Sequence, residues 1–255
     1  MEYYIVFVFG AIIGSFLNVC IYRIPLGKSV VMPRSFCPFC EKTIAWYDNV
    51  PLLSFLILGA KCRNCEKPIA FRYFLVELVT AISGIGLLKY YFLTPDFFVY
   101  WAFVCSLIVV IFIDLEYQEI PDVISIPGIF AGMVFMTAFK LDGSGSYWWS
   151  FSNSVLGILV GGGSMFLLGV LGEFIFKKEA LGGGDVKLMA MIGAFIGWKA
   201  VLLTFFMAPV VGSVVGIVMK IKFKKDMIAY GPYLSLAAIV SLLYGDRILK
   251  YLFRF

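Results

Sequence analysis

Apolar runs long enough to cross a lipid bilayer make up most of this chain. A bilayer core requires roughly 20 apolar residues per helix, and eight segments are candidates: residues 3–22, 71–93, 97–114, 123–139, 151–176, 186–197, 200–219 and 229–245. The sequence is 62% hydrophobic and 15% charged, whereas globular chains are about half apolar and about a quarter charged. It therefore predicts an all-α polytopic membrane protein of about eight helices. A tight turn is expected at Trp198-Lys199, between the sixth and seventh spans.

Lys and Arg are distributed unevenly over the connections between these spans. Loop 23–72 carries eight of them, and the segments expected on its side of the membrane carry fifteen in all, against six on the other side. Because cytoplasmic loops carry an excess of Lys and Arg, we expect the long loop to be cytoplasmic and both termini to be outside. The net charge of +5 follows from this bias. It indicates contact with anionic lipid rather than nucleic acid.

The first apolar run is expected to remain as a membrane helix. Glu2 stands where a signal peptide carries basic residues, and residues 14–18 contain no small-residue cleavage site. No repeat with a period of 20 to 50 residues is recognised. Residues 23–70 form the one stretch long enough for a separate folded module.

Two Cys-x2-Cys pairs, separated by 21 residues, lie in that polar stretch. This spacing is typical of zinc ribbons, in which two tight turns each supply two thiolates to a tetrahedral ion. Disulfides or a redox pair are the alternative, which a reducing cytoplasm disfavours. Because the chain has no histidine, a zinc site here needs all four thiolates. The predicted ligands are Cys37, Cys40, Cys62 and Cys65.

The absence of histidine excludes a Ser–His or Cys–His nucleophile and a histidine base. Among the carboxylates, Asp114 ends the third apolar run and Asp185 opens the sixth, after a run of three glycines at 182–184. Either could be a helix cap or a solvated boundary residue. Together they are expected at the same membrane depth, where ionisable groups are functional candidates.

Two adjacent carboxylates that share a proton can hydrolyse a peptide bond, one as general base and one as general acid. Asp114 lies at the negative end of its helix and Asp185 at the positive end of the next. We therefore expect Asp185 to be the base and Asp114 the acid. The glycines allow a close backbone approach, as a substrate strand requires.

Other carboxylates rank lower as candidates. Asp122 follows Ile120-Pro121 and is expected to start the fourth span. Glu77 lies inside the second span, where it either pairs with Arg72 or lines a site.

These residues resemble the type IV prepilin peptidases, GxGD-type aspartyl proteases that are also N-methyltransferases. The similarity covers nearly the whole chain and rests on motifs in a fixed order: Gly14-Ser-Phe-Leu-Asn18, Cys37-Pro-Phe-Cys40, Asn49-Val-Pro51, Cys62-Arg-Asn-Cys65, Ile113-Asp114, Ile120-Pro121-Asp122, Gly182-Gly-Gly184-Asp185-Val-Lys187 and Gly231-Pro-Tyr233.

The resemblance implies a division into a first membrane helix (1–22), a four-cysteine zinc loop associated with methyl transfer (23–70) and a peptidase bundle (71–255). It implies that Asp114 and Asp185 are the catalytic pair. The supporting positions carried over with them are Gly182, Gly184, Lys187, Asp122 and Glu77.

The implied substrates are prepilins and pseudopilins of type IV pili or type II secretion, with a short basic leader that is cut after a glycine on the cytoplasmic side. The new N-terminus would then be methylated with S-adenosylmethionine, at a donor site that the sequence does not identify. The expected location is the inner membrane of a bacterium. The rival reading is a transporter or membrane scaffold, in which the glycine-broken segment near Asp185 binds an ion or solute.

Overall fold

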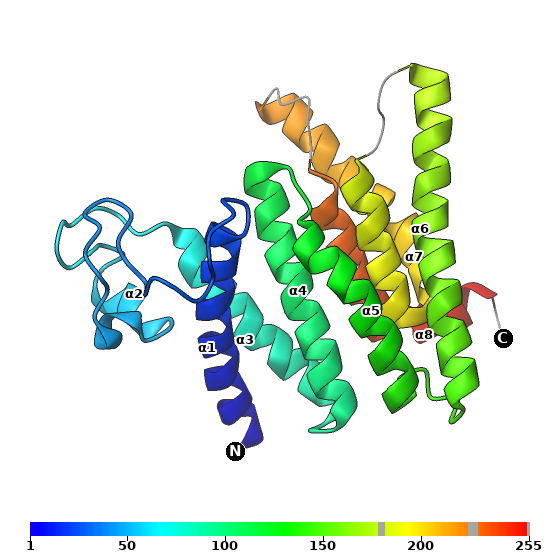
Figure 1. The fold of residues 1–255 in the computed structure, drawn as a ribbon, viewed down its shortest axis with the longest axis horizontal. Helices are drawn as coiled ribbons and strands as arrows, with labels where there is room; N and C mark the ends of the chain where they lie inside the picture. Colours follow the sequence, from blue (N-terminus) through cyan, green and yellow to red (C-terminus); the bar gives the residue numbers. More distant parts are fainter. Residues whose placement is uncertain (178–181, 224–228, 254–255) are drawn as a thin grey trace. The chain divides into compact units, whose positions relative to one another are not determined.

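The computed structural model describes residues 1–177, 182–223 and 229–253, and within these ranges the chain is helical (Figure 1). In these ranges, β pairing is limited to two isolated bridges, Phe36 with Thr43 and Lys61 with Pro68. The predicted all-α class is confirmed. Of the lysines counted above, Lys178, Lys224 and Lys225 lie outside the described residues. The helices are α1 (Glu2–Arg23), the 3-10 turn η1 (Trp46–Asn49), α2 (Leu53–Ile57), α3 (Phe71–Tyr91), α4 (Pro95–Tyr117), α5 (Asp122–Phe139), α6 (Tyr147–Phe176), α7 (Gly183–Phe223) and α8 (Gly231–Phe253).

The helices fall into two compact units, Met1–Val109 and Val110–Phe255, with α4 contributing to both. In the first unit, α1 and α3 pack almost backbone to backbone. A Cβ added at Gly10 would lie 2.6 Å from the Cα of Ala81, and one added at Gly14 would lie 2.6 Å from the Cα of Glu77. Small residues permit this approach, as in other membrane helix pairs.

Polar contacts fix the loop at the end of α1. Asn18 donates its side-chain amide to the carbonyl of Tyr73 at 3.0 Å. Arg23 is buried and donates to the carbonyls of Ser29 at 2.9 Å and Pro33 at 2.7 Å. The Asn18 bond ties α1 to α3, and the Arg23 bonds hold the loop that follows α1 against the end of that helix. Arg23, one of the eight basic residues of loop 23–72, is therefore also a structural residue.

The second unit is built around α7, which folds back on itself at Gly197. That residue is non-helical, with φ of 75° and ψ of 174°. A Cβ added at Gly161 of α6 would contact both Met189 and Val201. Twelve residues of one straight helix would separate those two positions by about 18 Å. The chain therefore reverses at Gly197, and the tight turn expected at Trp198 is present.

Asn153 of α6 secures this turn by accepting a hydrogen bond from the backbone N–H of Trp198 at 3.3 Å. The amide of Asn153 also donates to Asp142, which accepts the hydroxyl of Ser150 at 2.6 Å. This polar cluster starts α6 at Tyr147. The sequence-based start at residue 151 was four residues late.

Seven of the described helices are long and apolar enough to cross a membrane. One of them is α7, whose two arms correspond to the sixth and seventh spans expected from the sequence. Because α7 supplies two passes, these seven helices account for the eight passes expected from the sequence.

Candidate functional site

Four cysteine sulfur atoms meet in the loop between α1 and α3. All four Sγ atoms lie within 4.8 Å of one another, and those of Cys37 and Cys65 are 3.8 Å apart. Four thiolates that bind zinc at about 2.3 Å in a tetrahedron have sulfur atoms about 3.8 Å apart. The cluster can therefore hold a tetrahedral metal ion. Its members are those predicted: Cys37, Cys40, Cys62 and Cys65.

The two cysteine pairs sit on matching turns. In the first, the N–H of Cys37 donates to the carbonyl of Lys42 at 3.0 Å. In the second, the N–H of Cys62 donates to the carbonyl of Lys67 at 2.9 Å. Each turn thus closes on its own backbone and presents two thiols to the same side. We call residues 35–70, with both turns, the zinc module.

The match between the turns extends to the sequence. Cys-x-x-Cys-Glu-Lys-x-Ile-Ala occurs at residues 37–45 and again at 62–70. Glu41 and Glu66 occupy equivalent places, with φ of 57° and 55°. The expectation that no repeat with a period of 20 to 50 residues exists was therefore wrong. The repeated unit is too short to stand out against the long apolar runs.

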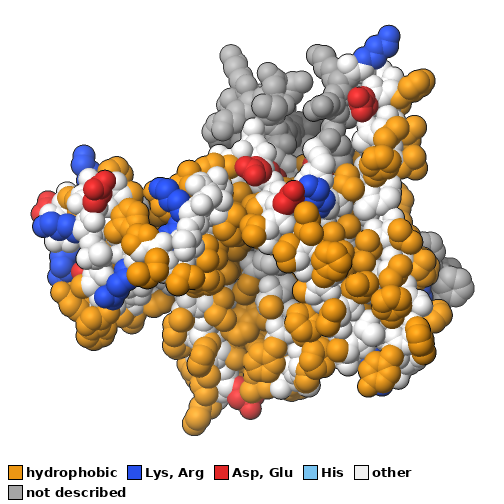
Figure 2. All heavy atoms as spheres, in the orientation of Figure 1, with side chains coloured by type: hydrophobic (Ala, Val, Ile, Leu, Met, Phe, Trp, Pro, Cys, Tyr) orange, Lys and Arg blue, Asp and Glu red, His pale blue; other side chains and the backbone are white. Residues whose placement is uncertain are grey.

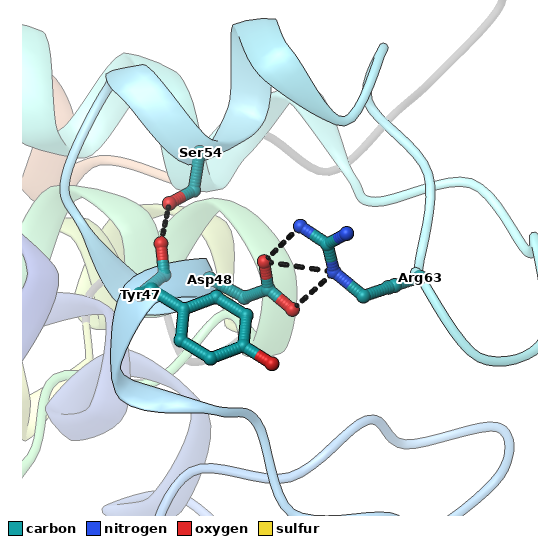
Figure 3. A network of polar contacts seen from close by, with 4 residues as sticks. All are labelled: Tyr47, Asp48, Ser54 and Arg63. Carbon is teal, nitrogen blue, oxygen red and sulfur yellow. Dashed lines mark hydrogen bonds and ion pairs between the residues drawn. The ribbon is translucent and has the colours of Figure 1, made fainter.

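An ion pair joins the second turn to η1. Arg63 donates to both oxygens of Asp48, with Nη2 2.6 Å from Oδ1 and Nε 2.8 Å from Oδ2 (Figure 3). The Arg63 guanidinium also lies 5.6 Å from the ring centre of Tyr47, and Ser54 of α2 donates to the Tyr47 carbonyl at 3.2 Å. The hydrogen bond from Arg63 holds the pKa of Asp48 below its usual value. Together these contacts link η1, α2 and the second cysteine turn.

Glu77 fastens the zinc module to α3. Its buried carboxylate accepts the N–H of Leu52 at 2.7 Å, and the side chain of Ser15 also hydrogen-bonds to it. Leu52 has φ of 61° and ψ of −48°, and the N–H of Leu53 donates across it to the Pro51 carbonyl at 2.7 Å. This is a γ-turn of the rare, strained kind. Neither role weighed for Glu77 from the sequence included this contact.

Asp114 lies in the last turn of α4 and is 5% exposed. Its Oδ2 accepts the backbone N–H of Gly231 at 2.8 Å, where α8 begins. A Cβ added at Gly231 would lie 2.7 Å from the same Oδ2. A side chain at position 231 would therefore displace this carboxylate from its present place. In the sequence, Gly231 belongs to the motif Gly231-Pro-Tyr233, which by itself assigns it no role.

Asp185 lies in the first turn of α7, in the same unit. It interacts electrostatically with Asp114, and the backbone of Gly182 hydrogen-bonds to its side chain. A Cβ added at Gly184 would lie 2.9 Å from the Cβ of Ile120, and one added at Gly231 would lie 3.2 Å from the Cδ1 of Ile120. Gly184 is thus required by packing within the chain, in addition to any approach of a substrate.

Tyr230, which the sequence analysis did not single out, lies next to this pair. Burial, together with the negative charge of Asp185, raises the pKa of Tyr230 to about 12. The residue immediately precedes Gly231, so its place follows from the start of α8. A lone tyrosine before a glycine carries no signal in a sequence, and only the structure reveals its position.

Lys187 and Asp122 form an ion pair between the first turns of α7 and α5. The Lys187 amine lies 2.7 Å from each oxygen of Asp122. Both side chains are substantially exposed, at 41% and 56%. Asp122 is the first residue of α5, as the sequence predicted. The pair joins the start of α7 to the start of α5, directly after the connection that carries Ile120.

Two family models match this chain in succession. The Bacterial Peptidase A24 N-terminal domain matches residues 8–91, and the Type IV leader peptidase family matches residues 101–217. The first therefore covers α1, the zinc module and α3. The second includes Asp114, Asp122 and Asp185. No solved structure was found that matches the chain.

Several curated relatives carry the name prepilin leader peptidase/N-methyltransferase. One from Myxococcus xanthus is 41% identical over 213 residues, which is 84% of this chain and 62% of that protein. One from Aeromonas hydrophila is 32% identical over 97% of this chain and 92% of that protein. One from Pseudomonas aeruginosa is 31% identical over 94% and 90%. With similarity at this level over nearly its full length, the chain belongs to the type IV leader peptidase family.

Proposed function

We propose that this chain is a membrane aspartic endopeptidase that removes the leader from prepilins, with Asp114 and Asp185 as its catalytic pair. The observation that supports the proposal is that Gly231, whose N–H binds Asp114, and Gly184, which directly precedes Asp185, both lie against Ile120. The sequence contains no histidine that could take either role. The names of the relatives supply the substrate class.

The chemistry requires one ionised and one protonated carboxyl group. The ionised group takes a proton from water as the water oxygen attacks the scissile carbonyl carbon, while the protonated group donates to the carbonyl oxygen. Collapse of the resulting tetrahedral diol breaks the C–N bond, and the departing amine takes up a proton. The Gly231 N–H holds Asp114 in place through these steps.

The same chain then methylates the new N-terminus of the pilin. S-adenosylmethionine supplies the methyl group, and the N-terminal amine gives up a proton when it accepts it. The four cysteines of the zinc module hold a zinc ion that fixes the fold of residues 35–70. The names of the relatives, which include N-methyltransferase, support this second activity.

Both activities face the cytoplasm in this proposal. If each membrane helix crosses once and α7 crosses twice, the zinc module, Asp114 and Asp185 all lie on one side. Fifteen of the 21 Lys and Arg residues lie on that side too, and this bias marks the cytoplasmic face. The chain is then a multi-pass protein of the bacterial inner membrane.

The test is to mix the purified protein with a prepilin whose short basic leader ends in glycine, and to follow the products by mass spectrometry. We expect leader removal and, with S-adenosylmethionine present, the gain of one methyl group. Asp114→Asn and Asp185→Asn should each abolish cleavage, and the double variant should be no slower than either, because the two act as a unit.

Asp246→Asn is the matched control, because Asp246 is an exposed carboxylate in α8. It should cleave normally. Wild-type cleavage by either single catalytic variant, in protein that is inserted and folded, would remove that residue from the mechanism.

A further inference from the structure

Helix α2 of the zinc module has its apolar side chains outward. Leu53, Leu56 and Ile57 are 57%, 64% and 77% exposed, whereas Ser54, its one polar residue, is buried. The Ser54 hydroxyl is turned inward to the carbonyl of Tyr47. A helix on a water-exposed surface has the opposite arrangement, with polar residues outward. Something apolar must therefore face α2.

This apolar surface is continuous with a membrane helix. Phe55 of α2 packs against Phe71 and Phe74 in the first turn of α3, with ring centres 6.3 Å and 5.3 Å away. Phe71 is itself 61% exposed, and α3 is one of the helices able to cross the membrane. Helix α2 thus lies directly beside the start of α3, with the ring of Phe55 in contact with the first turn of that membrane helix.

Residues suited to the membrane surface surround this patch. Trp46 of η1 is 75% exposed and Tyr47 is 53% exposed, and these two residue types are enriched at the boundary between lipid and water. Side chains of Lys42, Lys61 and Lys67 are exposed on the two cysteine turns. Lysines near a membrane attract anionic headgroups. In Figure 2 apolar side chains cover the end of the module where Figure 1 labels α2, with basic side chains beside them.

We propose that α2 and its neighbours lie in the surface of the lipid bilayer. The inserted face consists of Trp46, Leu53, Leu56, Ile57 and Phe71, and we call it the α2 face. It enters the boundary between headgroups and acyl chains of the leaflet next to the zinc module, as amphipathic surface helices do. The module is thereby held at a fixed height against the membrane, rather than standing free in solution.

The test places a single environment-sensitive fluorophore on an added cysteine at Ile57→Cys, in the full-length zinc-loaded protein, with one chain per lipid nanodisc. Cys20 and Cys105 are buried, and zinc protects the other four cysteines. Nitroxide lipids labelled near the headgroup end of the acyl chain serve as quenchers. The matched control is Thr43→Cys, an exposed position on the first cysteine turn.

We expect emission from position 57 to shift to the blue and to be quenched several-fold more strongly than emission from position 43. Replacing phosphatidylglycerol by phosphatidylcholine should weaken the quenching at position 57. Equal quenching at the two positions, or none at either, would overturn the proposal. A blue shift without lipid quenching would also overturn it, because it would mean that protein covers the α2 face.

A second variant separates insertion from folding. Leu56→Glu introduces a charge into the α2 face, and it should reduce quenching at position 57 several-fold while the protein keeps one zinc ion per chain. Unchanged quenching in this variant, with zinc still bound, would overturn the proposal, because the apolar side chains of the α2 face would then not be what holds α2 in the lipid. If zinc is lost, Leu56→Ser replaces it, with the same expected reduction to a smaller degree.

Discussion

Asp114 takes a backbone partner from a helix that begins 117 residues further along the chain. The sequence alone places Asp114 at the C-terminal, negative end of its own helix. A negative charge is disfavoured there, which suggested that Asp114 keeps the proton shared with Asp185. The contact with Gly231 adds the N-terminus of α8, whose N–H groups favour a negative charge. Asp185 also lies at a helix N-terminus. The helix-end argument therefore no longer separates a base from an acid, and the two are better treated as one coupled pair.

Gly231→Ala tests this contact at the scale of a single methyl group. The added Cβ would lie 2.7 Å from Asp114 Oδ2, so the carboxylate must move and its hydrogen bond must lengthen. A shift of this kind at a catalytic group costs on the order of 100-fold in rate. We expect a loss of that size in leader cleavage measured with purified protein.

Gly163→Ala is the control, because the space around Gly163 in α6 is open. It should leave cleavage unchanged. If Gly231→Ala cleaves like the wild type while remaining folded, the position of Asp114 does not depend on α8.

Among single residues, the sequence predicts those whose chemistry is unusual for their surroundings. Asp114 and Asp185 could be proposed as a pair because ionisable groups at membrane helix ends that face the bundle are functional candidates. Gly231 and Tyr230 acquire their roles only from contacts with segments far away in the chain. A single sequence has no local pattern that reports such contacts.

Among the elements, the zinc module brings four thiols together with little polypeptide around them. Each cysteine turn is closed by its own backbone bonds, and the module has a five-residue helix rather than a large core. A zinc ion bound as proposed would therefore supply much of its folding free energy.

Cys40→Ser should reduce the zinc content of the purified protein well below one ion per chain, because one of four thiolates is lost. Metal analysis of protein prepared without chelator is the measurement. Cys105→Ser is the comparison, since Cys105 is buried in α4 away from the cluster. One zinc ion per chain in Cys40→Ser would contradict a site of four thiolates.

Glu77→Gln tests how the module is attached to α3. The variant keeps the size of the side chain but removes the charge from the acceptor that holds the strained turn at Leu52. Weakening a buried hydrogen bond of this type costs about 1–3 kcal/mol. We expect the backbone amides of α2 to exchange with solvent roughly 10-fold faster or more, in line with that free energy.

The exposed Glu66 lies on the same module, and Glu66→Gln should leave the exchange unchanged. Equal exchange rates in the wild type and Glu77→Gln would mean that other contacts hold the γ-turn.

Element boundaries were predictable where a glycine or a capping residue marks them. A turn at Trp198-Lys199 and a helix start at Asp122 were expected, and the structure has the turn at the adjacent Gly197 and the start of α5 at Asp122. The start of α6 was placed too late, because Trp148 and Trp149 read as part of a loop. What extends the helix back to Tyr147 is the cluster of Asp142, Ser150 and Asn153, which depends on tertiary contact.

For the whole molecule, the proposed orientation makes a prediction about two positions on opposite sides of the membrane. A cysteine introduced at Ser144, in the connection before α6, should react with a membrane-impermeant reagent in intact spheroplasts. One at Thr43, in the zinc module, should react only after the membrane is opened. Labelling by gel shift measures both. The reverse pattern would contradict the assignment of the Lys-rich side to the cytoplasm.

The number of membrane helices could be predicted from hydropathy, because hydropathy acts over whole segments. The division into compact units could not. The peptidase bundle expected from residue 71 stays a prediction, and the two compact units divide at Val109, inside α4. Helix continuity hides such a boundary, since an apolar run looks the same whichever unit it packs in.

Helix α4 is covalently part of both compact units, and this limits where the protein can be divided. A cut at Val109 would break a helix whose two halves each need the other to complete the span. The short connection at residues 92–94 lies between α3 and α4, and also between the two matched family models. Two genes that divide there would each encode whole helices. A junction at this turn keeps every helix whole, and the price is that residues 95–109 of α4 leave the unit in which they pack.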